Sequence, residues 1–201
     1  FYSRSRAVAS EDEIRIIEEA QMEPAAQGDR AGAYRVMVAV ANPENALSMV
    51  KTTYRLSRAK QAKVELLHMV PVPDQVRLAD AEKYMHAGRE AITEVMLYLA
   101  PLFPLSTTFR YCRSVARGII SAVREKRTAL LILGWRGTGA KSRRFLLDST
   151  IDPILDRVPC NTVILKGCGD RDFKNILVPV SGGPNSAFAL EIASILADPQ
   201  E

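Results

Sequence analysis

Residues 129–166 read ALLILGWRGTGAKSRRFLLDSTIDPILDRVPCNTVILK, and this stretch decides the fold class. It begins with an apolar run, 129–133, which Gly134 ends, and continues through a loop rich in glycine and arginine. The pattern then predicts a helix at about 149–157 and a short strand at 161–166. A strand, a helix and a second strand in this order are typical of a parallel sheet, because parallel neighbours need a long crossover connection.

The same alternation extends toward the N-terminus. Strands are predicted at 36–41, 63–70 and 107–113, and helices at 44–60, 80–102 and 115–126. The runs at 36–41 and 129–133 are apolar throughout, as central strands covered on both faces are. Strand 107–113 alternates and is expected nearer an edge. The chain is therefore predicted to be an α/β protein with a parallel sheet covered on both faces.

The predicted domain spans 34–167 and has a different segment on either side. Residues 1–33 are predicted to be a juxtamembrane helix and linker, because Ser10 and the acids after it favour a helix start. The apolar face of that helix would be Ile14, Ile16, Ile17 and Ala20. Residues 168–201 are predicted to begin a second, truncated copy of the domain, because 36–57 and 176–197 align without a gap.

Composition places the chain among soluble globular proteins. Of the 201 residues, 47% are hydrophobic and 25% are charged, and the net charge of +4 follows no stripe that would indicate a nucleic-acid partner. No apolar run approaches the roughly 20 residues that span a bilayer. Cys112, Cys160 and Cys168 fall singly, which favours a reduced, cytoplasmic setting over disulfides or a zinc site.

Open parallel sheets bind ligands beyond the carboxyl ends of their strands, near the point where strand order reverses. Glycines there let a phosphate approach the main chain, and a helix start offers free N–H groups to an anion. The candidate ligand-binding residues on this edge are Ala41, Asn42, Val70, Gly134, Gly137, Gly139, Ser149 and Thr150. We predict no catalytic residue and no metal site, because no nucleophile with a base, no paired carboxylates and no metal cluster are found.

The stretch LLILGWRGTGAKSRRFLLDSTIDPILDRVPCNTVIL resembles the signature region of the universal stress protein family, and VARGIISAVREKRTALLILG resembles the segment before it. The resemblance covers about 34–166. It implies a Rossmann-like fold of the adenine nucleotide alpha hydrolase type, with five parallel strands in the order 3-2-1-4-5. It also implies ATP or another adenine nucleotide as the ligand, and a homodimer formed through the fifth strand, 161–166.

Two departures from the family pattern bear on that ligand. Ala41 stands where nucleotide-binding members usually place an aspartate, and Asp148 stands where they place the third glycine. Asp148 is a good helix N-cap, would compete for the N–H groups that a phosphate needs and would repel the phosphate. Lys141, Arg143 and Arg144 could offset this, or could be a solvated loop. The residues favour loss of the family's standard mode of ATP binding.

Other single residues are interpreted as structural. Trp135 could stack on a base, but packing is favoured at a strand end. His68 and His86 have no acid or hydroxyl partner at a useful spacing, and Cys112 and Cys160 are predicted to be small buried residues.

A second resemblance concerns the whole protein. Phe1-Tyr2 with Arg4 and Arg6 is typical of the cytoplasmic end of a membrane helix. Paired universal stress domains after such a segment resemble the cytoplasmic tails of amino acid permeases of the amino acid–polyamine–cation superfamily, and some cation/proton antiporters carry similar tails. This implies a regulatory domain, not an enzyme, on the cytoplasmic side of the cell membrane. The alternative is a free-standing tandem universal stress protein that binds ATP with weak or no ATPase activity.

Overall fold

The chain is described by a computed structural model over residues 14–22, 34–40, 46–85, 89, 92–93, 96, 105–135, 150–166, 173 and 175–197. Six strands form one sheet in the order β1-β4-β3-β2-β5-β6. The strands are β1 (Ile14–Met22), β2 (Arg35–Val40), β3 (Lys63–Pro71), β4 (Leu105–Cys112), β5 (Leu130–Trp135) and β6 (Asn161–Lys166). The helices are α2 (Ala46–Lys60), α4 (Val115–Glu125), α5 (Ile151–Leu155) and α6 (Pro184–Ala197).

The five strands β2 to β6 are parallel to one another. Numbered from β2, their order across the sheet is 3-2-1-4-5, which confirms the predicted fold class. Strand β2 lies at the switch point, because the chain leaves it toward β3 on one side and reaches β5 on the other.

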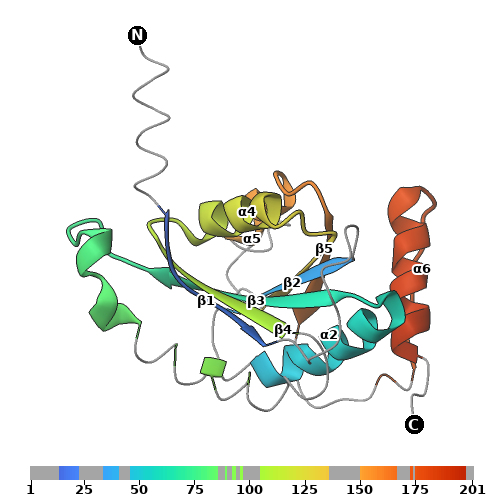
Figure 1. Cartoon of the computed structure of the whole chain (residues 1–201). Helices are drawn as coiled ribbons and strands as arrows, with labels where there is room; N and C mark the ends of the chain where they lie inside the picture. Colours follow the sequence, from blue (N-terminus) through green and yellow to red (C-terminus); the bar gives the residue numbers. More distant parts are fainter. Residues whose placement is uncertain are drawn as a thin grey trace.

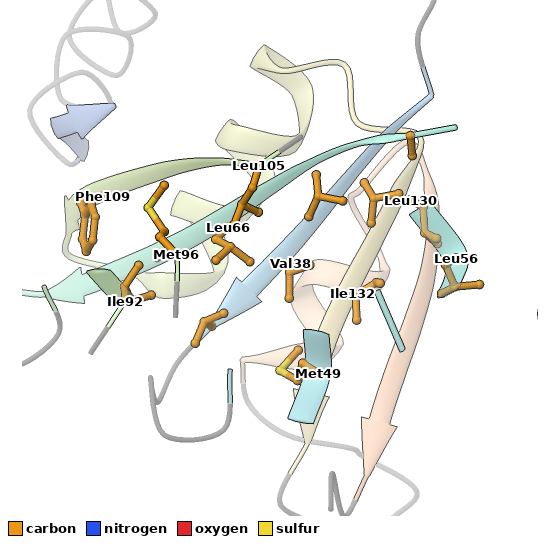
Figure 2. Packing of buried hydrophobic residues seen from close by; sticks show 14 of the residues in the cluster. Val38, Met49, Leu56, Leu66, Ile92, Met96, Leu105, Phe109, Leu130 and Ile132 are labelled. Carbon is orange, nitrogen blue, oxygen red and sulfur yellow. The ribbon is translucent and has the colours of Figure 1, made fainter. Parts of the chain in front are cut away.

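Helices cover both faces of the sheet, with α4 and α5 on one face and α2 on the other (Figure 1). Alternate residues of the central strands pack into the two core layers, one on each face of the sheet. Val38 and Ile132 pack toward α2, whereas Met37 and Leu131 pack toward α4. Figure 2 shows the first of these layers, with Val38 of β2 and Ile132 of β5 near Met49 of α2, and Leu66 of β3 nearer Met96. This burial on both faces explains why β2 and β5 are apolar throughout.

The helix predicted at Ile14, Ile16, Ile17 and Ala20 is wrong, because these residues belong to strand β1. Strand β1 runs antiparallel to β4, from Ile14 opposite Cys112 to Met22 opposite Leu105, with a register shift between Ile16 and Glu18. An isolated helix of this length is marginal in water, whereas the edge of β4 offers a row of main-chain partners. Strand β4 lies near an edge, as its alternating pattern predicted, and β1 is the strand outside it.

Three other boundaries differ from the predictions. Strand β5 does not end at Gly134 but continues to Trp135, which pairs with Lys166 of β6. The predicted α-helix from residue 80 is replaced at its start by two 3-10 turns, Leu78–Asp80 and Glu82–Tyr84. Helix α5 is shorter than predicted, since it begins at Ile151.

The second copy of the repeat contributes a helix but no strand. Residues 176–181 align with the strand predicted at 36–41 but pair with no strand among the described residues, so the prediction of a strand there is wrong, and Leu177 is 93% exposed. After a turn in which Gly182 and Gly183 adopt positive φ angles of 88° and 86°, helix α6 packs on α2. Leu196 is buried in the α2-side core, and the same core is contacted by Phe188, Ile192 and Ile195. Within the described ranges, no helix is both long and apolar enough to span a membrane.

Candidate functional site

The strand ends around β2 are staggered. The pairing of β2 with β3 ends at Val40 and His68, and its pairing with β5 ends at Ala39 and Leu133. Strand β3 nevertheless continues to Pro71 beside β4, and β5 continues to Trp135 beside β6. The two strands that flank the switch point therefore extend beyond the paired part of β2, where ligands of such sheets bind.

Two predicted site residues, Val70 and Gly134, lie on these extensions. The Val70 side chain is 3% exposed and packs with Val72, Met85 and Tyr111, so only its main chain can serve a ligand. Gly134 is exposed, and a Cβ atom there would come 3.1 Å from the Met49 Sδ of α2. The glycine thus keeps the main chain at the end of β5 accessible beside α2.

Thr150 occupies the N-cap position of α5 and makes no capping hydrogen bond with its side chain. The helix after it has only five residues, and its buried Ile151 and Ile154 fix it to the α4-side core. The other predicted site residues lie outside the described residues: Ala41, Asn42, Gly137, Gly139 and Ser149, together with Asp148. Their placement at this edge stays a prediction.

His68 lies next to this site and was not predicted to belong to it. Its Nδ1 lies 2.8 Å from the carbonyl oxygen of Val40, the last residue of β2, and must donate because a carbonyl only accepts. The ring also meets Phe109 edge-on, with centroids 6.0 Å apart. Burial lowers the pKa of His68, although the bond to Val40 opposes the shift. The only signal in the sequence is a polar residue inside an apolar strand.

The lowered pKa of His68 predicts a pH-dependent stability. The folded state disfavours the protonated ring, so the stabilisation is complete above the unfolded pKa of about 6.5 and is lost as the pH falls below it. We expect His68→Gln, which can still donate to Val40, to reduce the loss of stability between pH 7.5 and pH 5.5. Urea unfolding at both pH values measures this, with His86→Gln as the control. An unchanged pH dependence in His68→Gln would contradict the assignment.

Trp135 packs against the α4-side core, as predicted. The ammonium of Lys166 lies 4.7 Å from its ring centroid, at the carboxyl ends of β5 and β6. The indole N–H is buried without a hydrogen-bond partner among the described residues. A lysine over the ring leaves one aromatic face less available to a base, which agrees with packing as the main role.

The loop after β3 is held beside Val70 by Arg113. Its Nη1 donates to the carbonyl oxygens of Val72, at 3.2 Å, and of Pro73, and its Nη2 donates to that of Val76 at 2.5 Å. The main-chain N–H of Val72 also donates to Cys112. Arg113 therefore fixes one wall of the candidate site, a role that its position as the last residue of a predicted strand did not indicate.

Burial disfavours the thiolate form of both described cysteines. Cys112 is fully buried, as predicted, and burial raises the pKa of its thiol to about 11. Cys160 is only half-buried, which corrects the prediction of a buried residue, and burial raises its pKa as well. Neither thiol is activated at neutral pH.

Comparison with known proteins identifies relatives of this fold. The model of the universal stress protein family matches residues 33–166. Among curated proteins, the Na⁺/H⁺ antiporter NhaS5 of Synechocystis sp. is 26% identical over 159 residues, which cover 75% of this chain and 22% of the antiporter. The matched region is thus less than a quarter of that protein's length.

Several solved structures share the architecture. Universal stress protein UspA from Lactobacillus plantarum has a TM-score of 0.54 and 18% identity, covering 68% of this chain and 99% of UspA. A universal stress protein from Archaeoglobus fulgidus has a TM-score of 0.53 and 10% identity, covering 65% and 97%. The Archaeoglobus fulgidus protein in complex with dAMP has a TM-score of 0.50 and 11% identity, covering 65% and 96%. At these identities the likeness concerns the fold alone.

Proposed function

Because the chain belongs to the universal stress protein family, we propose that it is a regulatory domain of a membrane transporter, acting through an adenine nucleotide or through pairing with a second copy. The observation that carries the proposal is the similarity to a Na⁺/H⁺ antiporter over 75% of this chain. A domain of this kind would lie on the cytoplasmic side of the membrane and bias the transporter between two conformations.

Two classes of transported substrate are considered, cations and amino acids. The aromatic and arginine pattern of residues 1–6 fits the end of a membrane helix in either class. The resemblance to permease tails favours amino acids, whereas the antiporter relative favours a cation. We give more weight to the antiporter, because its similarity extends over 159 residues and the permease resemblance rests on short stretches.

Two described features of the candidate site fit an adenine nucleotide. Val70 offers main-chain groups at the end of β3, and Gly134 allows close approach at the end of β5. The relative from Archaeoglobus fulgidus that forms a complex with dAMP supports the same class of ligand. Ala41 and Asp148 oppose standard binding, because one removes an expected carboxylate and the other adds a charge that repels phosphate.

Titration of the chain with ATP, cyclic AMP and cyclic di-AMP by calorimetry tests the nucleotide. We expect Asp148→Gly to bind ATP roughly tenfold more tightly than the unmodified chain, because it removes a like charge beside the phosphates. Asp156→Asn is the control, since Asp156 follows the last residue of α5 and is exposed. If no nucleotide binds either form, the nucleotide part of the proposal fails and pairing becomes the leading role.

Pairing with a second copy is supported by strand β6. Among the described strands it is an outer one, with β5 as its one neighbour, and its residues from Thr162 to Leu165 are half-buried. An outer strand with such residues is a natural place for another strand to add. A concentration-dependent molar mass in solution would support this.

The repeat at 176–197 favours one other function, a free-standing tandem universal stress protein. The coding sequence before Phe1 separates the two. A series of hydrophobic spans supports the transporter, and a start codon close by supports the tandem protein. Loss of regulation in a transporter that lacks this domain would then establish the regulatory role.

A further inference from the structure

Two nitrogen donors at the carboxyl ends of β5 and β6 have no acceptor among the described residues. The indole N–H of Trp135 is buried and makes no hydrogen bond there. Lys166 is paired with Trp135 across the two strands, and its ammonium lies 4.7 Å from the centroid of the indole ring. No ion pair between Lys166 and a carboxylate is found in the described ranges. A buried donor without an acceptor is unfavourable, so the indole N–H needs a partner.

Both donors lie on the α4 side of the sheet. Trp135 packs in the α4-side core, as do Leu133 of β5 and Ile164 of β6. Lys166 follows Ile164 by two residues, a spacing that keeps both side chains on one face of a strand. Lys166 and Gly134 are exposed, so solvent reaches the end of this strand pair. Within the described part of the chain the ammonium contacts the ring but forms no ion pair, so it can turn toward an incoming group at little cost.

The chemistry of this pair selects an anion. An indole N–H only donates hydrogen bonds, and an ammonium is a positive point charge with three donors. Phosphate suits both groups, because its oxygens accept several hydrogen bonds and lysine binds it as a point charge. The start of α5 is a weaker place for a phosphate, since this helix has only five residues and Asp148 puts a negative charge before it in the sequence.

We propose that the Lys166 ammonium and the Trp135 indole N–H form an anion site at the carboxyl ends of β5 and β6, and that this site binds the phosphate groups of a nucleotide. The inference rests on the adenine nucleotide of the proposed function. It assigns the phosphates to side chains of β5 and β6 rather than to the main chain at the start of α5. Lys166 then offsets the negative charge that Asp148 adds, and added salt weakens binding because it screens an exposed charge.

Intrinsic fluorescence of the full chain tests the site directly, because Trp135 is its only tryptophan. We expect ATP and inorganic phosphate to change the Trp135 emission, and adenosine, which has no phosphate, to leave it unchanged. In parallel calorimetry, Lys166→Met is expected to weaken ATP binding about tenfold, because a charge-assisted hydrogen bond is lost. Lys166→Arg keeps the charge and should retain most of the affinity. Lys83→Met is the matched control, since Lys83 lies 5.2 Å from the ring centroid of Tyr84, outside the β5–β6 pair.

The outcomes separate this inference from the proposed function. Equal ATP affinity in Lys166→Met and in the unmodified chain would overturn the anion site and leave the nucleotide in place. A response to inorganic phosphate that requires Lys166, without ATP binding, would support the anion site and remove the nucleotide. No response to either ligand would overturn both. Equal losses in Lys166→Met and Lys83→Met, or an equal response to adenosine and ATP, would overturn the site as well, because the effect would then depend neither on Lys166 nor on phosphate.

Discussion

Leu196→Lys is expected to release α6 from the domain while the sheet stays folded. Leu196 is 7% exposed in the α2-side core, and Arg55 donates from Nη1 to its carbonyl oxygen at 2.9 Å. A lysine ammonium at this position would be buried without an acceptor and would lie near a second cation. We expect the α6 amides to lose roughly a hundredfold in exchange protection, because burying an unpaired charge costs more than one apolar side chain contributes.

The control for this experiment lies on the same helix. Leu190 is 52% exposed, so Leu190→Lys adds the same charge without removing a buried side chain. We expect α6 to keep its protection in that variant, with the ion pair between Lys60 and Glu191 intact. Equal loss of protection in both variants would show that the charge, and not the packing of Leu196, decides whether α6 docks.

Ile132→Ala is expected to lower the free energy of unfolding by about 4 kcal/mol, near the upper end for such truncations. Ile132 is fully buried in β5, which has β2 on one side and β6 on the other. Its side chain fills the layer between the sheet and α2, together with Val38 and Met49 (Figure 2). The surrounding strands cannot collapse into the cavity, because both neighbours hold β5 in register. Urea unfolding followed by circular dichroism measures the loss.

Val163→Ala on the outer strand β6 is the comparison for Ile132→Ala. Val163 is half-buried and packs against the same layer, so its truncation should cost only about 1 kcal/mol. A cost for Val163→Ala that matches that of Ile132→Ala would mean that β6 is covered in solution. That result would support pairing of two copies through this strand.

The strands of the parallel sheet were predictable because their signals are local, whereas their order across the sheet was predicted from the family resemblance. Each strand from β2 to β6 is an apolar segment bounded by loop residues, and each helix between them has its own apolar face. The all-apolar runs of β2 and β5 required helices on both faces, which the two packed layers confirm. The central position of these two strands was predicted from their apolar composition, without knowledge of any contact.

The positions of two candidate residues at strand ends were predictable, whereas their role in binding stays a prediction. Val70 and Gly134 were found because the carboxyl edge at a switch point is where such sheets bind ligands. His68 and Arg113 were missed, because their roles depend on contacts between strands and loops distant in the sequence. His68 is placed by the register of β3 against β2, and Arg113 by the path of the loop after β3.

By itself, the sequence determined the alternation of strands and helices, the parallel sheet and the family, since these depend on apolar spacing and on motifs within short segments. Only the tertiary structure decided the state of the flanking segments. Residues 14–22 are a strand because β4 supplies their main-chain partners, and α6 docks on α2 although residues 176–181 pair with no strand among those described. Both outcomes depend on partners more than 80 positions away in the chain, which local pattern cannot reveal.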